Sequence, residues 1–298
     1  MTDPSLSFDQ LIRSVGCRAF FTQYWQRRSL SVDLDKATFA RVLADVGPLE
    51  IVSIAKKARE GVQAWISGPD ILHSVFDADA TTVSDFHKVG ATLYFVDVPL
   101  PNITDRVADA LGAPRRRVKA SLFLSSRSSG ASAHFDSNEN FTVQLTGTKR
   151  WFVESAPMAV MPPVGHVLGH RPAPSVEKLI PQRRAPTEHC FKLKPGAFLY
   201  VPRGTVHRTS ADAESWSLNI SYAGTTWLEL LQEGLRQQLV VSPRWRSTVT
   251  GASKDCDPEA SGANIFPELI DELRQLLDDP QELENLYRAF LGAPNSKA

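Results

Sequence analysis

The sequence predicts an α+β fold that is mainly β, with a sandwich or barrel in the middle of the chain and helices on either side. Between about residues 91 and 222, short runs of β-branched and aromatic residues alternate with turn residues. Before and after this region, apolar residues recur three and four positions apart, which is the period of one helix face. Many short strands joined by short turns are typical of a closed or two-layered sheet.

The predicted strands follow one another with turn residues between them. Clear turn signals are Thr146-Gly147-Thr148 and Pro195-Gly196. We predict strands at residues 91–98, 118–125, 141–146, 150–154, 190–193, 197–201 and 216–222.

One connection between these strands, residues 155–187, is unusually long and rich in proline. A loop of that length inside a compact domain is usually functional, so we expect a lid or a wall of a substrate site. It carries His166 and His170, four positions apart. We expect these to be solvent-exposed loop histidines rather than a second metal site.

Helical patterns frame the strands. Within the first 70 or so residues, Phe8, Leu11 and Ile12 begin a helical stripe. After residue 222 three leucine-rich stripes follow, and Asp279-Pro280 has the capping side chain and the fixed φ angle of a helix start. We therefore predict one domain over residues 1–223 and a separate helical region over 224–298, which is a candidate for forming a homodimer.

Composition excludes several classes of protein. The 298 residues include 33 basic and 33 acidic ones, so no net field attracts the whole molecule to nucleic acid or to a membrane. Three cysteines, Cys17, Cys190 and Cys256, are too few and too scattered for a disulfide framework or a CxxC metal site. The N-terminus lacks a signal-peptide pattern, and no apolar run approaches the length of a membrane span. We expect a cytoplasmic protein without direct nucleic-acid binding.

One short pattern has the residue types of a metal site. His134 and Asp136 are two positions apart, so in an extended chain their side chains point to the same face. His207 follows a predicted strand and a tight turn. Two histidines and one carboxylate leave three coordination positions of an octahedral metal ion open, as non-haem Fe(II) oxygenases require. A structural zinc ion instead takes four protein ligands, which usually include cysteine. On spacing alone, polar residues at the surface are the favoured interpretation of this pattern.

Two longer segments resemble the JmjC-type protein hydroxylases, including their bacterial ribosomal-oxygenase-like branch. The first segment, HFDSNENFTVQLTGTKR from His134 to Arg150, has the family's HxD, an asparagine, an alternating strand, a glycine-containing hairpin and a basic residue fifteen positions after the first histidine. The second segment, PGAFLYVPRGTVHRTSADAESWSLNISY at 195–222, is similar to the family's second-histidine region. The resemblance implies a double-stranded β-helix (cupin or jelly-roll) core, with residues 1–223 as the catalytic domain.

The resemblance also implies a metal and a co-substrate. His134, Asp136 and His207 would be the catalytic ligands of Fe(II), and 2-oxoglutarate and dioxygen would be the co-substrates. Lys149, fifteen residues after His134, would hold the distal carboxylate of 2-oxoglutarate through a charge-assisted hydrogen bond.

Two asparagines are further candidates by the same resemblance. Asn140 and Asn219 would hydrogen-bond the co-substrate or an iron ligand. The chain departs from some relatives at Ala131, three residues before the first histidine, where those relatives place a hydroxyl that assists the co-substrate carboxylate. The residues that could replace this hydroxyl are Ser128, Ser129 and Ser132.

The activity implied by the resemblance is hydroxylation of a C–H bond. The expected substrate is a protein or peptide side chain, with a ribosomal protein or a precursor peptide as the partner. Two alternatives stay open at this point. One is a hydroxylase of a free amino acid or other small molecule, and the other is a non-enzymatic cupin-like binding protein.

Overall fold

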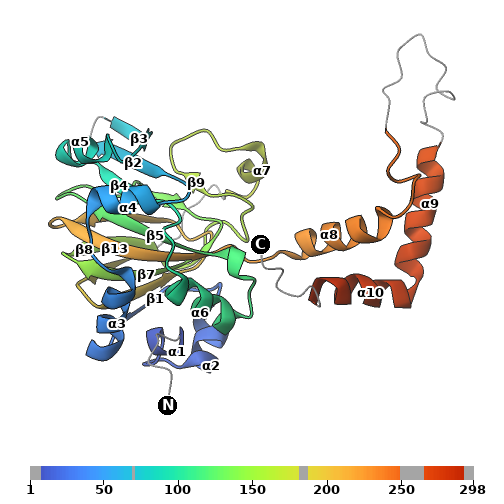
Figure 1. Cartoon of the computed structure of the whole chain (residues 1–298), viewed down its shortest axis with the longest axis horizontal. Coiled ribbons are helices and arrows are strands. Elements are labelled where there is room, and N and C mark those ends of the chain that lie inside the picture. Colours follow the sequence, from blue (N-terminus) through green and yellow to red (C-terminus); the bar gives the residue numbers. More distant parts are fainter. Residues whose placement is uncertain (1–7, 69–70, 181–186, 249–264, 292–298) are drawn as a thin grey trace, which may run out of the picture. The chain divides into compact units, whose positions relative to one another are not determined.

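The computed structural model describes residues 8–68, 71–180, 187–248 and 265–291. The chain divides into two compact units, Met1–Gly224 and Thr225–Ala298. The first unit contains the strands and the second contains helices (Figure 1).

Two antiparallel sheets make up the first unit. The larger sheet has eight described strands in the order β1 (Leu30–Asp33), β11 (Ala197–Val201), β7 (Glu139–Thr146), β13 (Ser215–Tyr222), β5 (Val118–Ser125), β4 (Thr92–Phe95), β2 (Val62–Gly68) and β3 (Ile71–Ala78). The smaller sheet has five, in the order β10 (Glu188–Leu193), β8 (Lys149–Glu154), β12 (His207–Ala211), β6 (His134–Phe135) and β9 (His166–Val167).

Most successive strands from β5 onward cross from one sheet to the other. Strands β5, β7, β11 and β13 belong to the larger sheet, whereas β6, β8, β10 and β12 belong to the smaller one. This crossing is the jelly-roll arrangement, and the predicted double-stranded β-helix is confirmed. One consequence matters for function, because the crossing places His207 directly opposite His134 on neighbouring strands.

The central strands are buried on both faces. All five residues of β11 and the first seven of β7 are buried. One face looks into the roll, and aromatic residues of the N-terminal segment cover the other: Phe8 lies 5.3 Å and Phe20 6.5 Å from Phe141, measured between ring centroids. Helix α6 (Pro101–Leu111) packs on β5 and contacts α1 (Phe8–Leu11) and α3 (Lys36–Val46).

The prediction that the first 70 or so residues are helical is wrong in part. This region holds α1, α3, α2 (Cys17–Ala19), the π-helix η1 (Phe20–Tyr24) and α4 (Ile51–Lys57). Strand β1, however, pairs with β11 at the edge of the larger sheet, and β2 begins at Val62. The four residues of β1 have too short a pattern to be recognised locally; they are extended because β11 offers them an unpaired edge.

The long connection between β8 and β10 is not a plain loop. Its described part contains β9, which pairs with β6, and the short helix α7 (Pro174–Glu177). Residues 181–186 lie outside the described part. Two further elements are short. Helix α5 (Val83–Lys88) lies between β3 and β4, and the 3-10 turn η2 (Arg115–Arg117) lies between α6 and β5.

The second unit contains the predicted helices α8 (Trp227–Leu239), α9 (Ile265–Asp278) and α10 (Pro280–Leu291). A capping box of Thr226 and Glu229 starts α8, and Asp279 accepts hydrogen bonds from the first turn of α10. Apolar side chains such as Trp227, Leu228 and Phe266 are exposed in this unit. Dimerisation through it stays a prediction.

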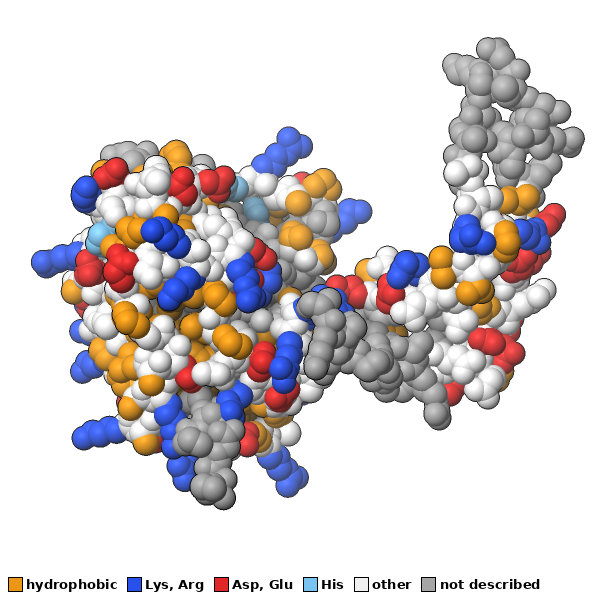
Figure 2. Space-filling view, in the orientation of Figure 1, with side chains coloured by type: hydrophobic (Ala, Val, Ile, Leu, Met, Phe, Trp, Pro, Cys, Tyr) orange, Lys and Arg blue, Asp and Glu red, His pale blue; other side chains and the backbone are white. Residues whose placement is uncertain are grey.

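Surface charge agrees with the balanced composition. Acidic and basic side chains are interspersed on the face of the molecule shown in Figure 2. Among the described residues, no helix is both long and apolar enough to span a bilayer.

Candidate metal centre and adjoining cavity

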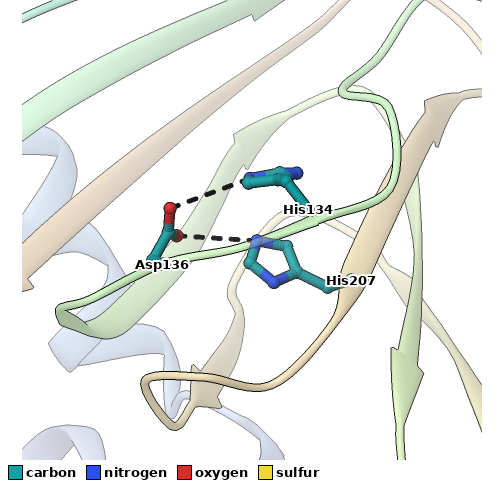
Figure 3. A group of neighbouring side chains, drawn as sticks. All are labelled: His134, Asp136 and His207. Carbon is teal, nitrogen blue, oxygen red and sulfur yellow. Dashed lines mark ion pairs between the residues drawn. The ribbon is translucent and has the colours of Figure 1, made fainter. Parts of the chain in front are cut away.

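Three side chains meet where β6 and β12 lie side by side. His134 is the first residue of β6, Asp136 follows that strand, and His207 is the first residue of β12. The Nε2 atoms of His134 and His207 lie 3.9 and 3.7 Å from the two carboxylate oxygens of Asp136 (Figure 3). One donor atom from each residue falls within 4.8 Å of the others, which is the spacing of ligands around a single ion.

Hydrogen bonds fix the tautomer of both histidines. The Nδ1 atom of His134 lies 2.6 Å from the carbonyl oxygen of Ser132, and Nδ1 of His207 lies 2.9 Å from that of Thr205. A carbonyl only accepts, so each Nδ1 carries the hydrogen and each Nε2 keeps a lone pair directed at the cluster. Burial, together with the neighbouring His134, lowers the pKa of His207 to about 4. The imidazole is therefore neutral at pH 7, as a metal ligand must be.

A chain of side-chain hydrogen bonds orients Asp136. The amide nitrogen of Asn140 donates to Oδ2 of Asp136 at 2.7 Å, and the amide nitrogen of Asn219 donates to Oδ1 of Asn140 at 3.0 Å. Thr142 in turn donates to Oδ1 of Asn219 at 3.0 Å. Both predicted asparagines thus reach the site. Asn140 contacts the carboxylate directly, and Asn219 holds Asn140 in place.

The turn before His207 is tied to the segment that carries Asp136. The backbone N–H of Gly204 donates to the carbonyl of Asp136 at 2.7 Å. The backbone N–H groups of Met158 and Ala159 donate to the carbonyl of Gly204. Gly204 has a φ of 76°, and a Cβ there would lie 1.9 Å from the carbonyl oxygen of Ala159. Only glycine fits this position, so glycine is what allows the turn before His207 to lie against Ala159 of the long connection.

We therefore expect Gly204→Ala to lower the free energy of unfolding by about 2–3 kcal/mol, since it adds a backbone collision to the strain of a positive φ. Gly112→Ala is the matched control, because Gly112 has a φ of 60° with nothing within 4 Å of its Cβ position. The control should lose about 1 kcal/mol from backbone strain alone. Urea unfolding of both variants measures the difference, and equal losses would contradict the role of the Gly204 contact.

A buried ion pair lies beneath the same turn and was missed by the sequence interpretation. Glu139 accepts a hydrogen bond from the hydroxyl of Tyr200 at 2.6 Å, and its Oε1 lies 3.5 Å from Nε of Arg203. Burial raises the pKa of Glu139, while the contacts with Tyr200 and Arg203 oppose that rise. The pair joins the start of β7 to the turn after β11, which again fixes one ligand segment on the other. Glu139 stands two residues before Phe141, and nothing in this local sequence predicts a buried ion pair.

The cluster opens into a cavity of about 330 Å³ between the two sheets. Aromatic rings form much of its wall: Trp151 stacks on His207 with ring centroids 5.4 Å apart, and Trp65 lies edge-on to His134 at 6.3 Å. Gly165, His166 and Val167 of the long connection line the cavity as well. The expectation that His166 is a solvent-exposed loop residue is therefore wrong, because β9 holds it against β6, whereas His170 is exposed.

Lys149 lies in the wall of the same cavity. Lys149 is only 3% exposed, and its Nζ atom lies 5.4 Å from the centre of the Phe123 ring. In the part of the chain that the structure describes, no carboxylate pairs with Lys149, and burial lowers its pKa to about 7. A buried ammonium without an anion is costly, so this position is suited to an anionic ligand that enters the cavity.

The predicted replacements for the hydroxyl missing at Ala131 do not reach the cavity. None of Ser128, Ser129 and Ser132 is part of its wall. The hydroxyl of Ser129 instead donates to the carbonyl of Ser126 at 2.8 Å.

Comparison with known proteins identifies a domain within the chain. Residues 100–230 match the model of the JmjC domain. The chain carries a JmjC domain. All six predicted site residues lie within that range, since the first is His134 and the last is Asn219.

Several relatives align along most of this chain. It is 29% identical over 291 residues to the uncharacterized protein YxbC of Bacillus subtilis, an alignment that covers 92% of this chain and 87% of that protein. It is 28% identical over 250 residues to mouse ribosomal oxygenase 2, covering 78% of this chain and 50% of the mouse protein. The ribosomal protein uL16 3-hydroxylase of Escherichia coli is 22% identical over 287 residues, covering 91% and 70% of the two chains. The chain thus spans half the length of the mouse relative.

A solved structure has the same fold. The ribosomal oxygenase YcfD of Escherichia coli, in complex with cobalt and 2-oxoglutarate, superposes with a TM-score of 0.57 at 18% identity. The match covers 92% of this chain and 70% of that one.

Proposed function

We propose that this JmjC protein is an Fe(II)- and 2-oxoglutarate-dependent dioxygenase that hydroxylates a C–H bond of a protein side chain. The observation that carries the proposal is that a two-histidine, one-carboxylate cluster shares one cavity with a buried lysine, which pairs with no carboxylate among the described residues. The cluster suits a divalent metal, and the lysine suits the far carboxylate of a ligand that also reaches the metal. The match to the JmjC domain and the ribosomal oxygenases among the relatives support this assignment.

The donor set fits iron. His134, Asp136 and His207 would hold the metal through two neutral imidazole Nε2 atoms and one carboxylate, all from one side. Bound iron supplies the activation of dioxygen, using electrons from 2-oxoglutarate, which becomes succinate and carbon dioxide. A structural zinc site would need a fourth protein ligand, and the described residues offer none in this cluster.

The chain's own residues bind, orient and shield. Lys149 holds the distal carboxylate of 2-oxoglutarate, and Asn140 keeps Asp136 turned toward the metal position. The rings of Trp65, Tyr94 and Trp151 exclude water from the reacting groups. The partly exposed members of the wall, such as Val75 on β3, mark where a substrate side chain can enter.

A ribosomal protein is the substrate that the relatives favour. The mouse relative is named a ribosomal oxygenase, and the Escherichia coli relative is named a hydroxylase of the ribosomal protein uL16. A substrate of this kind also implies a cytoplasmic enzyme, because ribosomes work there.

The test combines two measurements on the purified chain. Supplied with Fe(II), 2-oxoglutarate and ribosomal proteins of its host, it should form succinate and add about 16 Da, the mass of one oxygen atom, to one ribosomal protein. Hydroxylation of a free amino acid instead would show that the substrate is a small molecule and would contradict the proposed protein substrate. Absence of both succinate formation and 2-oxoglutarate binding would refute the enzyme.

The pKa of Lys149 makes co-substrate binding depend on pH. With a pKa of about 7 in the free protein, the amine is mostly neutral at pH 8. A bound carboxylate favours the charged form and raises that pKa, so binding at pH 8 should take up about 0.9 proton, and at pH 6 only about 0.1. Affinity should accordingly fall as the pH rises above 7.

Titration calorimetry at pH 8, in buffers with different ionisation enthalpies and with Mn(II) in place of iron, measures this uptake. Lys149→Arg is the matched control, because a guanidinium stays charged and should take up no proton. Identical heats for the wild-type protein in all buffers would contradict the prediction.

A further inference from the structure

The wall of the cavity continues onto β3, which is the last described strand at one end of the larger sheet. On the neighbouring β2, Gln63 and Trp65 line the cavity. Val75 of β3 is paired with Trp65, and Asp77 is paired with Gln63. Because residues directly opposite each other in an antiparallel pair share a face, Val75 and Asp77 lie on the cavity side of β3. Val75 is part of the cavity wall, whereas Asp77 is not, so Asp77 lies at the rim.

The other face of β2 and β3 is directed at helix α5 and agrees with this orientation. Phe76 stacks on Phe86 of α5 with ring centroids 6.0 Å apart, and Ala64, which is paired with Phe76, is buried. Successive side chains of a strand point to opposite faces, so the side chain of Asp77 points away from α5. It is exposed at the rim of the cavity.

Asp77 differs from neighbouring aspartates because its side chain has no partner in the part of the chain that the structure describes. Asp79 accepts hydrogen bonds from the backbone of the turn that follows it, and Asp85 pairs with Lys88 at 2.9 Å. From Val62 to His87 the sequence has four aspartates and no lysine or arginine. This segment therefore carries a negative field, and the charge of Asp77 is available to a cation from outside the chain.

Two further side chains at the rim suit a cation on a long apolar stem. The indole Nε1 of Trp65 donates to Oε1 of Gln63 at 3.2 Å, which fixes the carboxamide and leaves its oxygen a second lone pair. Because Gln63 is directly opposite Asp77, carboxamide and carboxylate adjoin and can both accept from a guanidinium or an ammonium group. Val75, which is 48% exposed, offers an apolar surface to the methylene stem of such a side chain.

We propose that Asp77, Gln63 and Val75 form a subsite for an arginine or lysine side chain of the protein substrate, which flanks the residue that is hydroxylated. The inference rests on the proposed function and names the kind of sequence that the enzyme accepts. A protein that binds ribosomal RNA carries many such side chains, because they neutralise phosphates.

The place of the subsite explains why the basic residue flanks the target. Trp65 lies 6.3 Å from the ring of His134, so a side chain that reaches the metal cluster passes this tryptophan. Asp77 instead lies on the outer strand, two residues beyond Val75. Alternate residues of an extended chain are about 7 Å apart, so a substrate side chain a few positions from the target reaches Asp77.

The test measures hydroxylation by the full chain with Fe(II) and 2-oxoglutarate, first on total ribosomal protein of the host and then on a synthetic peptide that spans the modified residue. We expect an arginine or lysine within about three positions of the residue that gains an oxygen atom. Asp77→Asn should lower kcat/KM for the peptide about 5–30-fold, mainly through KM, because an interfacial charge pair is lost. Asp85→Asn is the matched control. It removes the same charge from α5, away from the cavity wall, and should stay within about twofold of the wild type.

An exchange of charges separates direct contact from a structural effect. In a second peptide, glutamate replaces the basic residue. Asp77→Lys should prefer this peptide, whereas the wild type should prefer the original one. Damage to the structure would lower the rate on both peptides equally.

Equal kcat/KM for the wild type and Asp77→Asn would overturn the subsite alone. The same holds if Asp77→Lys does not prefer the glutamate peptide, or if no basic residue lies near the target. A wild-type chain that modifies no protein would instead overturn the proposed function, and the subsite with it.

Discussion

Asp136→Ala is expected to reduce metal affinity on the order of a thousandfold. Asp136 supplies the only charged donor of the cluster, and its two oxygens face both histidine Nε2 atoms. Without it, two neutral imidazoles remain on one side of the ion. Loss of residues that merely orient metal ligands typically costs 10–100-fold, so loss of the charged ligand itself should cost more.

A graded set of variants tests this prediction. Calorimetric titration with Mn(II) should show the largest loss of metal affinity for Asp136→Ala. Asn140→Ala, which removes the hydrogen bond to Asp136, should lose about 10–100-fold in metal affinity. Asp105→Ala is the control, because Asp105 forms a surface ion pair with Arg115 and lies outside the cavity wall. Unchanged Mn(II) affinity in Asp136→Ala would mean that the metal binds elsewhere, and the proposed metal site would be wrong.

Lys149→Met is expected to abolish useful binding of 2-oxoglutarate while metal binding persists. The ammonium is buried in the cavity wall and has no carboxylate partner among the described residues. Methionine keeps the length and apolar stem of lysine but removes the charge. A charge-assisted hydrogen bond in a desolvated site is lost, so affinity should fall at least about 100-fold.

The same substitution should not destabilise the ligand-free protein. Burial lowers the pKa of Lys149, so the folded state disfavours the charged amine and its protonation opposes folding at neutral pH. The folded pKa of about 7 is below the unfolded value, so this lysine makes stability rise with pH from about 7 to about 10.5. Lys149→Met should remove that slope and give equal or higher stability at pH 7.

Calorimetric titration of 2-oxoglutarate into the Mn(II) protein, with urea unfolding at pH 7 and 9, checks both effects. Lys192→Met is the matched control. Lys192 lies on the adjacent strand β10 opposite Arg150, so it points to the other face, and its side chain is 54% exposed. The control should bind 2-oxoglutarate normally. A loss of stability in Lys149→Met without loss of binding would show that the lysine is structural.

Local spacing determined much of this site. The strands at 118–125 and 197–201 were predicted with the bounds that the structure has, because apolar runs with turn residues at both ends are a local signal. His134 and Asp136 share a face because they are two residues apart in an extended segment. Lys149 could be proposed from its distance of fifteen residues to His134 and from the family resemblance.

Tertiary structure alone decided which distant residues meet. His207 faces His134 because successive strands cross between the two sheets, and no local pattern encodes such a pairing. The contact of Glu139 with Arg203 arises in the same way, from the pairing of β7 with β11. The sequence by itself determined the residue types of the metal and co-substrate site. The register of the jelly roll decided which hydroxyl, amide and carboxylate groups lie close enough to support them, because hydrogen bonds require contact within about 3 Å.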